Sequence, residues 1–340
     1  MRFAFSVCRF AFPSPLCYPA LAMLTEVLRT VTVILGGLVA GYLSRKSGRL
    51  SADLSPRLNS LTLIYLQPIA TCLALWGMRD PTWQTALLPV YATVLILAML
   101  PVGALVARGM RLDRPSQGAF VEAAMFSNVG FTYGIFLAYV RLGDEGAALG
   151  SIYCLSFMPL IYTLGFLVAS RYAHDKPPTG AQMLRETFVK PESRNPLAAV
   201  AIGIALHYLG PPRPSSMQLL SDVTIPASTA AFLFSIGLGL RLSAVKRYWK
   251  PCAVVHGLKF VVSPAIGLGL AYVFGYFAPG NSHLLQVVII QSAAPTAIMA
   301  IVVTQVFGQN RDLANALWLT SNLSGVVVAP VLLYVTRMIG

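Results

Sequence analysis

The residues best suited to hold a small anion lie in two apolar stretches, each interrupted by small or helix-breaking residues. Residues 127–130 read Ser-Asn-Val-Gly, and residues 292–295 read Ser-Ala-Ala-Pro. Where a helix unwinds, backbone N–H and C=O groups lose their partners within the helix. The half-helix that follows presents free N–H donors and a partial positive charge, which suit a carboxylate. The two interruptions therefore predict a binding site for an organic anion.

Several side chains near these interruptions are candidates for substrate binding, and each also has a simpler structural explanation. An amide such as Asn128 inside an apolar stretch either contacts a substrate or bonds to another helix, and small hydroxyl residues often only permit close packing. Lys259 lies inside another apolar stretch, where it either attracts the anion or snorkels toward the cytoplasmic end. The predicted substrate-binding residues are Ser127, Asn128, Gly130, Lys259, Gln291, Ser292, Pro295, Thr296, Ser321 and Asn322.

No residue pattern indicates catalysis, a cofactor or a metal. The four histidines and five cysteines are dispersed, and no HExxH, G-x-S-x-G or CxxC pattern occurs. Among the acidic residues, only Glu26 and Glu122 lie inside apolar runs, with Asp222 at a boundary. Two-aspartate sodium/proton antiport is therefore disfavoured, and any proton coupling would fall to Glu122 or to the carboxyl group of the substrate.

The composition places these stretches in lipid. Hydrophobic residues make up 56% of the 340 residues, and charged residues only 11%, against about 25% in soluble domains. A soluble enzyme, a disulfide-stapled secreted domain and a disordered protein are excluded. The net charge of +13 would suggest nucleic acid in a soluble protein. Here the basic residues lie between apolar runs, so we expect them to face anionic lipid, with no nucleic-acid partner.

Ten apolar runs predict an all-α integral membrane protein with ten transmembrane helices. About 20 residues span the hydrocarbon layer, and a backbone in lipid must satisfy its own hydrogen bonds, so each run is expected to be a helix. The runs are 24–43, 58–77, 85–107, 118–140, 147–170, 196–209, 222–240, 251–278, 284–307 and 313–336.

The distribution of lysine and arginine predicts the orientation of these helices. Most of the basic residues fall in the odd-numbered connections, for example Arg45 and Lys46 in the first and Lys190 and Arg194 in the fifth. Because basic loops stay in the cytoplasm, we expect both termini outside and the 173–194 connection inside. The predicted location is the plasma (inner) membrane.

The two interruptions also reveal an internal repeat. A shift of the chain against itself aligns Ser127 with Ser292 and Ser156 with Ser321. Because each half has five predicted helices, the second half must cross in the opposite sense, as in the inverted repeats of secondary transporters. We expect a first repeat at 23–172, a cytoplasmic linker at 173–194 and an inverted second repeat at 195–340. Residues 1–22 form an N-terminal extension, which is either signal-like or precedes a start at Met23.

Short motifs in a characteristic order run along most of the chain. Residues 38–43 (LVAGYL) are followed by 45–51 (RKSGRLS), and Asn59 precedes Pro68 in the second run. Further along come Asn128-Val129-Gly130-Phe131, Asn195-Pro196 with Gly203, Lys259 with Pro264, and Pro295-Thr296-Ala297. In these motifs residues 24–337 resemble permeases of the auxin efflux carrier family, which includes bacterial malonate and malate-type permeases and plant auxin exporters.

The resemblance implies a fold related to bile-acid symporters and sodium/proton antiporters, with ten helices. In that fold helices four and nine are broken and cross at the substrate site. Helices one, two, six and seven form a dimerising scaffold, and the others form a mobile transport domain. The chain departs from the family pattern at Ile135, Met299 and Asn322. These departures argue against assigning the substrate of any characterised relative.

The sequence therefore predicts a permease for small organic anions, of the carboxylate class, that works by elevator-like alternating access. It also predicts a homodimer through helices one, two, six and seven. Two alternatives remain open: a sodium-coupled symporter of the bile-acid type, and a non-transporting sensor or scaffold with the same fold. An intramembrane enzyme is disfavoured. The substrate, the direction of transport and the coupling ion are not predicted.

Overall fold

The computed structural model describes residues 17–51, 53–79, 81–173, 179–239 and 245–339, and all regular elements in these ranges are helices. The first half contains α2 (Cys17–Lys46), α3 (Leu54–Leu61), η1 (Thr62–Leu66), α4 (Gln67–Trp76), α5 (Trp83–Ala86), α6 (Leu88–Gly109), α7 (Arg114–Met125), α8 (Gly134–Leu142), α9 (Asp144–Tyr153), η2 (Cys154–Ser156), α10 (Phe157–Leu160), η3 (Ile161–Gly165) and α11 (Phe166–Tyr172). The second contains α12 (Gly180–Phe188), α13 (Pro191–Leu209), α14 (Ser216–Gly239), α15 (Trp249–Gly257), η4 (Leu258–Val262), α16 (Ser263–Val273), α17 (Ser282–Ser292), α18 (Ile298–Val306) and α19 (Arg311–Arg337).

Six continuous helical stretches in the described ranges are long and apolar enough to cross a membrane. They are Arg57–Trp76, Trp83–Gly109, Asp144–Tyr172, Ser216–Gly239, Trp249–Val273 and Arg311–Arg337. They correspond to the second, third, fifth, seventh, eighth and tenth predicted runs. The fourth and ninth runs are each divided into two helices, and each half is too short to span the hydrocarbon layer alone.

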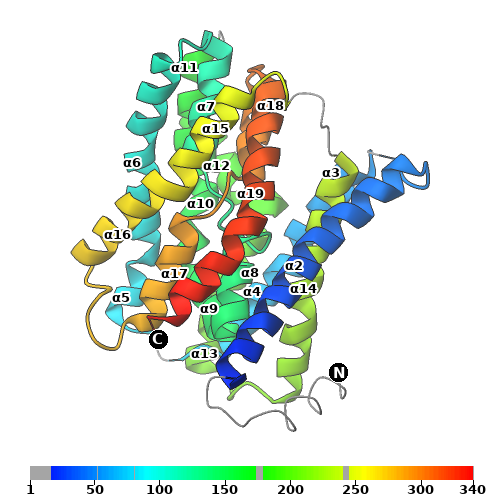
Figure 1. Ribbon diagram of the computed structural model, residues 1–340. Coiled ribbons are helices and arrows are strands. Elements are labelled where there is room, and N and C mark those ends of the chain that lie inside the picture. The colour runs from blue at the N-terminus through cyan, green and yellow to red at the C-terminus, as the bar shows by residue number, and fades with distance from the viewer. Residues whose placement is uncertain (1–16, 52, 80, 174–178, 240–244, 340) are drawn as a thin grey trace.

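The first helix is longer than predicted. It begins at Cys17, so residues 17–22 of the predicted 1–22 extension form the start of α2. Residues 1–16 lie outside the described residues. In the predicted 173–194 linker, residues 174–178 also lie outside them, and 180–188 form α12. The start of α2 and the end of α19 lie at the same end of the molecule (Figure 1).

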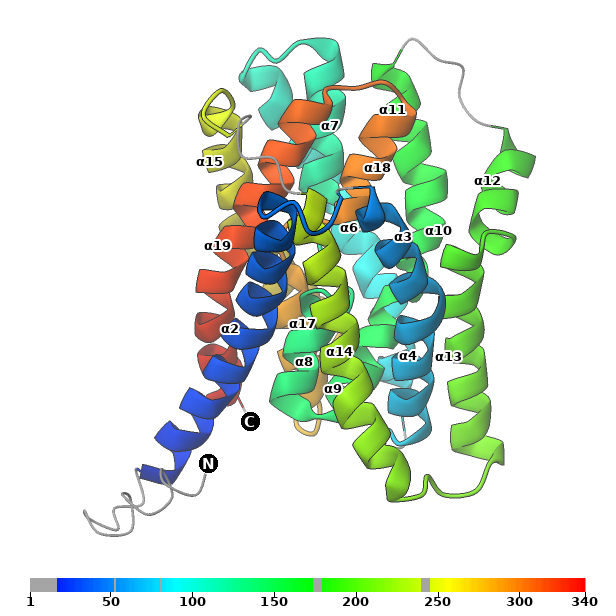
Figure 2. The ribbon, with the colours of Figure 1, turned by 90° about the vertical axis from the view of Figure 1, so that its right-hand side faces the viewer.

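Four segments pack together as a panel along one side of the molecule, which we define as α2, α3–α4, α13 and α14. The α14 helix lies against α2 along much of its length and also contacts α3 and α4, and α13 lies against α4 (Figure 2). Apart from α12, which contacts α13 and η3, the remaining helices, α5 to α11 and α15 to α19, form the body of the molecule. The panel consists of predicted helices one, two, six and seven.

The wide helical turns η1 and η4 are each followed closely by a proline, Pro68 and Pro264. The turn η1 links two helices of the panel. Pro68 has no N–H group to donate to Ile64, four residues earlier, so the Ile64 carbonyl is freed inside the wide turn η1. The Asn195 side chain donates to this carbonyl at 3.0 Å. Pro68 and Asn195 thus have a structural explanation, because the carbonyl that Pro68 leaves free in η1 is bonded by α13.

The α2–α14 contact depends on glycines that allow the two backbones to approach. A Cβ atom placed on Gly41 would overlap the Phe234 carbonyl oxygen, and one placed on Gly237 would overlap the Leu38 carbonyl oxygen. Close approach through small residues is a common way for helices to associate in lipid.

We therefore expect Gly41→Ala to destabilise the panel by about 1–3 kcal/mol, because α2 and α14 must separate to admit the methyl group. Gly36 on the same helix has open space around its Cβ position, so Gly36→Ala is the matched control and should stay within about 1 kcal/mol of the native protein. Thermal unfolding in detergent measures both, and equal melting temperatures for the two variants would contradict the packing described.

Candidate functional site

The two predicted interruptions are present, and they meet inside the molecule. The chain leaves helical geometry between Met125 and Gly134, and again between Ser292 and Ile298. The unwound segments run antiparallel and pair through their backbones. The Asn128 N–H donates to the Pro295 carbonyl at 2.6 Å, and the Ala297 N–H donates to the Phe126 carbonyl at 2.9 Å. Each unwound segment thus supplies hydrogen-bond partners for some backbone groups of the other.

The end of α7 is capped by side chains from two other segments. The Ala124 carbonyl would bond to the Asn128 N–H in a continuous helix; here it accepts from Lys259 Nζ at 2.8 Å. The Ala123 carbonyl accepts from the Thr296 hydroxyl at 3.2 Å. Lys259 also donates to Ser127 Oγ at 2.9 Å and is fully buried. It therefore does not snorkel; it places its amino group at the C-terminal end of α7, where the free carbonyls lie.

A polar network from α19 holds the crossing from the other side. Asn128 Nδ2 donates to Asn322 Oδ1 at 2.9 Å, and Asn322 Nδ2 donates to the Thr296 carbonyl at 2.9 Å. Asn128 Oδ1 accepts from the Thr132 hydroxyl. The Thr296 N–H donates to Ser321 Oγ at 3.2 Å. Asn128, Thr296, Ser321 and Asn322 are thus brought together, and their polar groups are largely occupied by each other.

Gln291 and Ser292 face neighbouring helices at the start of the second break. Gln291 is fully buried, and neither of its amide atoms has a hydrogen-bond partner in the described structure. It occupies space that the absence of a side chain at Gly134 leaves open. The Ser292 carbonyl accepts from the Ser263 hydroxyl of α16 at 2.7 Å.

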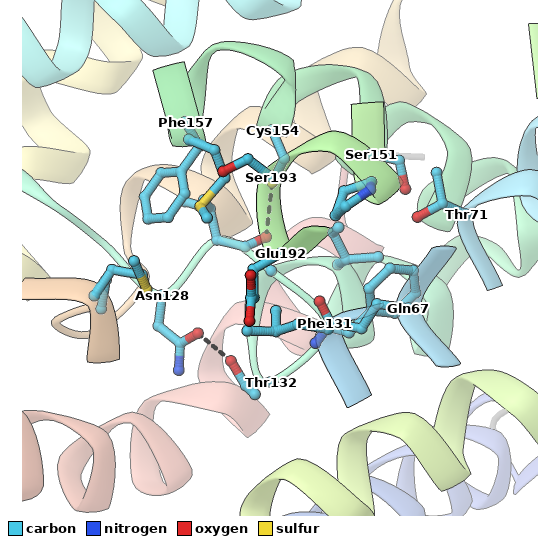
Figure 3. Close-up of a pocket in the computed structure, with 18 of the residues that line it drawn as sticks. Gln67, Thr71, Asn128, Phe131, Thr132, Ser151, Cys154, Phe157, Glu192 and Ser193 are labelled. Atoms are coloured by element: carbon cyan, nitrogen blue, oxygen red, sulfur yellow. Dashed lines mark hydrogen bonds between the residues drawn. The ribbon is translucent and has the colours of Figure 1, made fainter. Parts of the chain in front are cut away.

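A cavity of about 130 Å³ lies beside the crossing (Figure 3). Of the predicted site residues, Ser127, Asn128 and Gly130 line it, together with the following residues through Thr132 and the start of α18. The other seven predicted residues do not line it. Five of its lining residues have backbone N–H groups without a hydrogen-bond partner in the described structure: Gly130, Phe131, Thr132, Ile298 and Met299. These groups belong to the first break and to the N-terminal turn of α18, where donors carry partial positive charge.

A larger vestibule of about 530 Å³ continues from this cavity, with which it shares Leu63, Met158, Glu192, Ile298 and Met299. Its other lining residues include Ser55 near the start of α3, Lys190 before α13, Gln305 near the end of α18 and Asn315 near the start of α19. These positions lie near the α2–α3, α11–α13 and α18–α19 connections. The vestibule therefore lies toward the end of the molecule that carries the basic odd-numbered connections.

Several polar residues of the cavity were missed by the sequence analysis because they come from helices without interruptions. They are Gln67, Thr71, Ser151, Glu192 and Ser193, and Figure 3 shows them around the cavity. Glu192 is the one charged side chain among the described lining residues, and its Oε1 accepts from the Ser60 hydroxyl at 2.8 Å. The Ser193 hydroxyl is buried and has no partner in the described structure. In the sequence, only the position of Glu192, three residues before the Asn195-Pro196 motif, could have indicated that it lies near the site.

The opposite end of the molecule is closed by ion pairs between the panel and the body. Arg213, between α13 and α14, contacts Asp144 of α9 at 2.5 Å and donates to the Leu73 carbonyl of α4 at 2.9 Å. The Ser221 hydroxyl of α14 donates to the other Asp144 oxygen at 2.7 Å. Tyr139 of α8 donates to Asp222 of α14 at 2.7 Å. This set of contacts, the closing network, joins the two parts where the vestibule does not reach.

Two glycines at the first break differ in the space around them: Gly134 is packed against Gln291, and Gly130 lines the cavity. A Cβ atom on Gly134 would overlap Gln291 Oε1, whereas one on Gly130 meets nothing within 4 Å. We expect Gly134→Ala to lower the melting temperature of the purified protein, because α8 or Gln291 must shift. Gly130→Ala should fold with near-native stability. The reverse order of melting temperatures would contradict the described geometry of the break.

Comparisons with known proteins show the family to which the chain belongs. The family model described as "Membrane transport protein" matches residues 23–333. A protein of Methanothermobacter thermautotrophicus named "Uncharacterized transporter" is 23% identical over 316 residues, which are 90% of this chain and 96% of that protein. A protein of Rhizobium meliloti named "Putative malonate transporter" is 25% identical over 254 residues, which are 72% of this chain and 74% of that protein. These matches confirm the sequence-based recognition of a permease, and the chain belongs to the membrane transport protein family.

Proposed function

We propose that the protein is a secondary carrier for small organic anions of the carboxylate class. The observation that carries this proposal is the group of five free backbone N–H donors around a cavity at the crossing of two broken helices. Carboxylates are well matched to such donors at half-helix N-termini. The relative named for malonate supports the same class of substrate.

The proposal includes the finer architecture of ten crossings in two inverted five-helix repeats. The antiparallel pairing of the two unwound segments supports it, because an inverted repeat brings corresponding breaks together in opposite directions. The α2 helix, the short α13 and the divided fourth and ninth runs would then bring the six long spans to ten crossings. We place the basic end of the molecule, with the vestibule, in the cytoplasm and both termini outside.

Alternating access would take place between the panel and the body. The cavity reaches the basic end through the vestibule, while the closing network joins panel and body at the other end. In this arrangement the substrate would enter or leave on the cytoplasmic side. An elevator-like movement of the body against the panel would break the Asp144–Arg213 contact and expose the crossing outside. Homodimerisation through the panel would hold it fixed in the membrane.

Glu192 sets a constraint on the substrate. The cavity's described lining contains this one carboxylate and no basic side chain, so an anion there must be held by backbone and amide donors. A negative charge nearby opposes the binding of a second one. We infer that the cavity favours a substrate with a single carboxylate, or one whose second carboxyl group is protonated.

Transport in proteoliposomes tests the proposed site. Uptake of radiolabelled malonate and of a panel of monocarboxylates should fall about tenfold or more in Asn128→Ala and Pro295→Ala, because each change loosens the crossing that positions the free donors. Gly269→Ala on α16, where a Cβ meets nothing within 4 Å, is the control. Unchanged flux in both crossing variants would remove the proposed site, and flux that requires a sodium gradient would favour the symporter alternative.

The role of Glu192 is tested by Glu192→Gln, which removes the charge and keeps the shape. We expect it to bind dicarboxylates several-fold more tightly, with a smaller change for monocarboxylates. Ser60→Ala, which removes the hydroxyl that donates to Glu192 but leaves its charge, is the matched comparison. If the preference between the two substrate classes stays as in the native protein, the charge of Glu192 has no part in selection.

A further inference from the structure

A second cavity, separate from the crossing, lies among α6, α7 and α11 at the basic end of the molecule. Its volume is about 450 Å³, and it shares no lining residue with the substrate cavity or the vestibule. The α7 helix packs against both α6 and α11 there (Figure 1). The cavity is lined by Leu100, Ala104, Arg108, Arg114, Gln117, Val121, Val168, Arg171 and Tyr172.

Three arginines converge on this cavity without an acidic partner. Arg108, Arg114 and Arg171 are exposed, and no acidic residue is among the described lining residues. No ion pair joins any of the three to a described carboxylate. Arg114 donates to the Arg171 carbonyl at 2.6 Å, which holds its side chain across the gap between α7 and α11. Three guanidinium groups around one cavity repel each other unless an anion lies between them.

Each of the three helices also contributes an apolar lining residue on the side of its arginine. On α6, Leu100 and Ala104 precede Arg108 at four-residue intervals and so share its face. On α7, Val121 lies two turns beyond Arg114, and on α11 Val168 lies one turn before Arg171. The cavity is therefore basic toward the helix ends and apolar toward the middle of the proposed membrane.

We propose that this cavity binds the phosphate group of an anionic membrane lipid. Arginine presents a planar set of N–H donors that pairs with phosphate oxygens in two parallel bonds. Basic pockets between transmembrane helices on the cytoplasmic side suit anionic head groups. A free phosphate ion shares this chemistry, but only a lipid would also cover the half-buried Leu100 and Ala104 with an acyl chain. The occupant is therefore a phospholipid rather than a soluble anion.

The test compares the native protein in nanodiscs of phosphatidylcholine alone and with phosphatidylglycerol. Phosphatidylglycerol should raise the melting temperature and be retained in native mass spectra. In Arg108→Gln/Arg171→Gln its binding should be about 30-fold weaker, since each basic residue near the surface is worth about 1 kcal/mol. Arg57→Gln, which removes an exposed arginine of α3 at the same end, should bind the lipid as the native protein does.

Two results would overturn the proposal. One is equal retention of phosphatidylglycerol in the double variant and the native protein. The other is equal stabilisation by inorganic phosphate in phosphatidylcholine nanodiscs, which would assign the cavity to a soluble anion. If the glutamine variant does not fold, Arg108→Lys/Arg171→Lys keeps the charge but loses paired hydrogen bonding, and weaker lipid retention is then the expected result.

Discussion

The structure depends on how backbone polar groups are satisfied where two helices unwind inside lipid. An unpaired N–H or C=O group in hydrocarbon costs several kcal/mol, so an isolated break in a membrane helix is strongly disfavoured. Here the two breaks pair with each other through Asn128, Pro295, Phe126 and Ala297. Neither break would be stable alone, and their mutual pairing positions the halves of both helices.

This constraint explains why most of the conspicuous polar residues serve the crossing itself. Lys259 and Thr296 donate hydrogen bonds to carbonyls at the end of α7 that have lost their helical partners. Asn322 of α19 donates to the Thr296 carbonyl in the second break. The donors left for a ligand are mainly backbone N–H groups, which any sequence could supply. Selection among anions must then come from side chains at the cavity wall, and Glu192 is the one with a charge.

The positions of the breaks could be predicted from the sequence, because small and helix-breaking residues recur at one offset within long apolar runs. The role of Lys259 could not be predicted from its residue type. A lysine that caps a helix and one that binds substrate cannot be distinguished from the sequence alone. Glu192 lies in the predicted 173–194 connection, outside the apolar runs, so its position in the sequence did not mark it as a site residue. Its place in the cavity follows from the packing of α13 against α4, a contact between segments far apart in the chain.

The two cavities divide the work of the proposed carrier between its core and its edge. In the proposed carrier, the cavity at the crossing would hold the anion where panel and body meet, and the arginine-lined cavity would join the body to the inner leaflet. The central claim is that free backbone donors in both breaks bind the carboxylate. Amide hydrogen exchange with and without a monocarboxylate that the protein transports tests it most directly: exchange should slow in residues 126–133 and 293–299 together, while α16 is unaffected. Unchanged exchange in both segments of a protein that transports the anion would contradict the account.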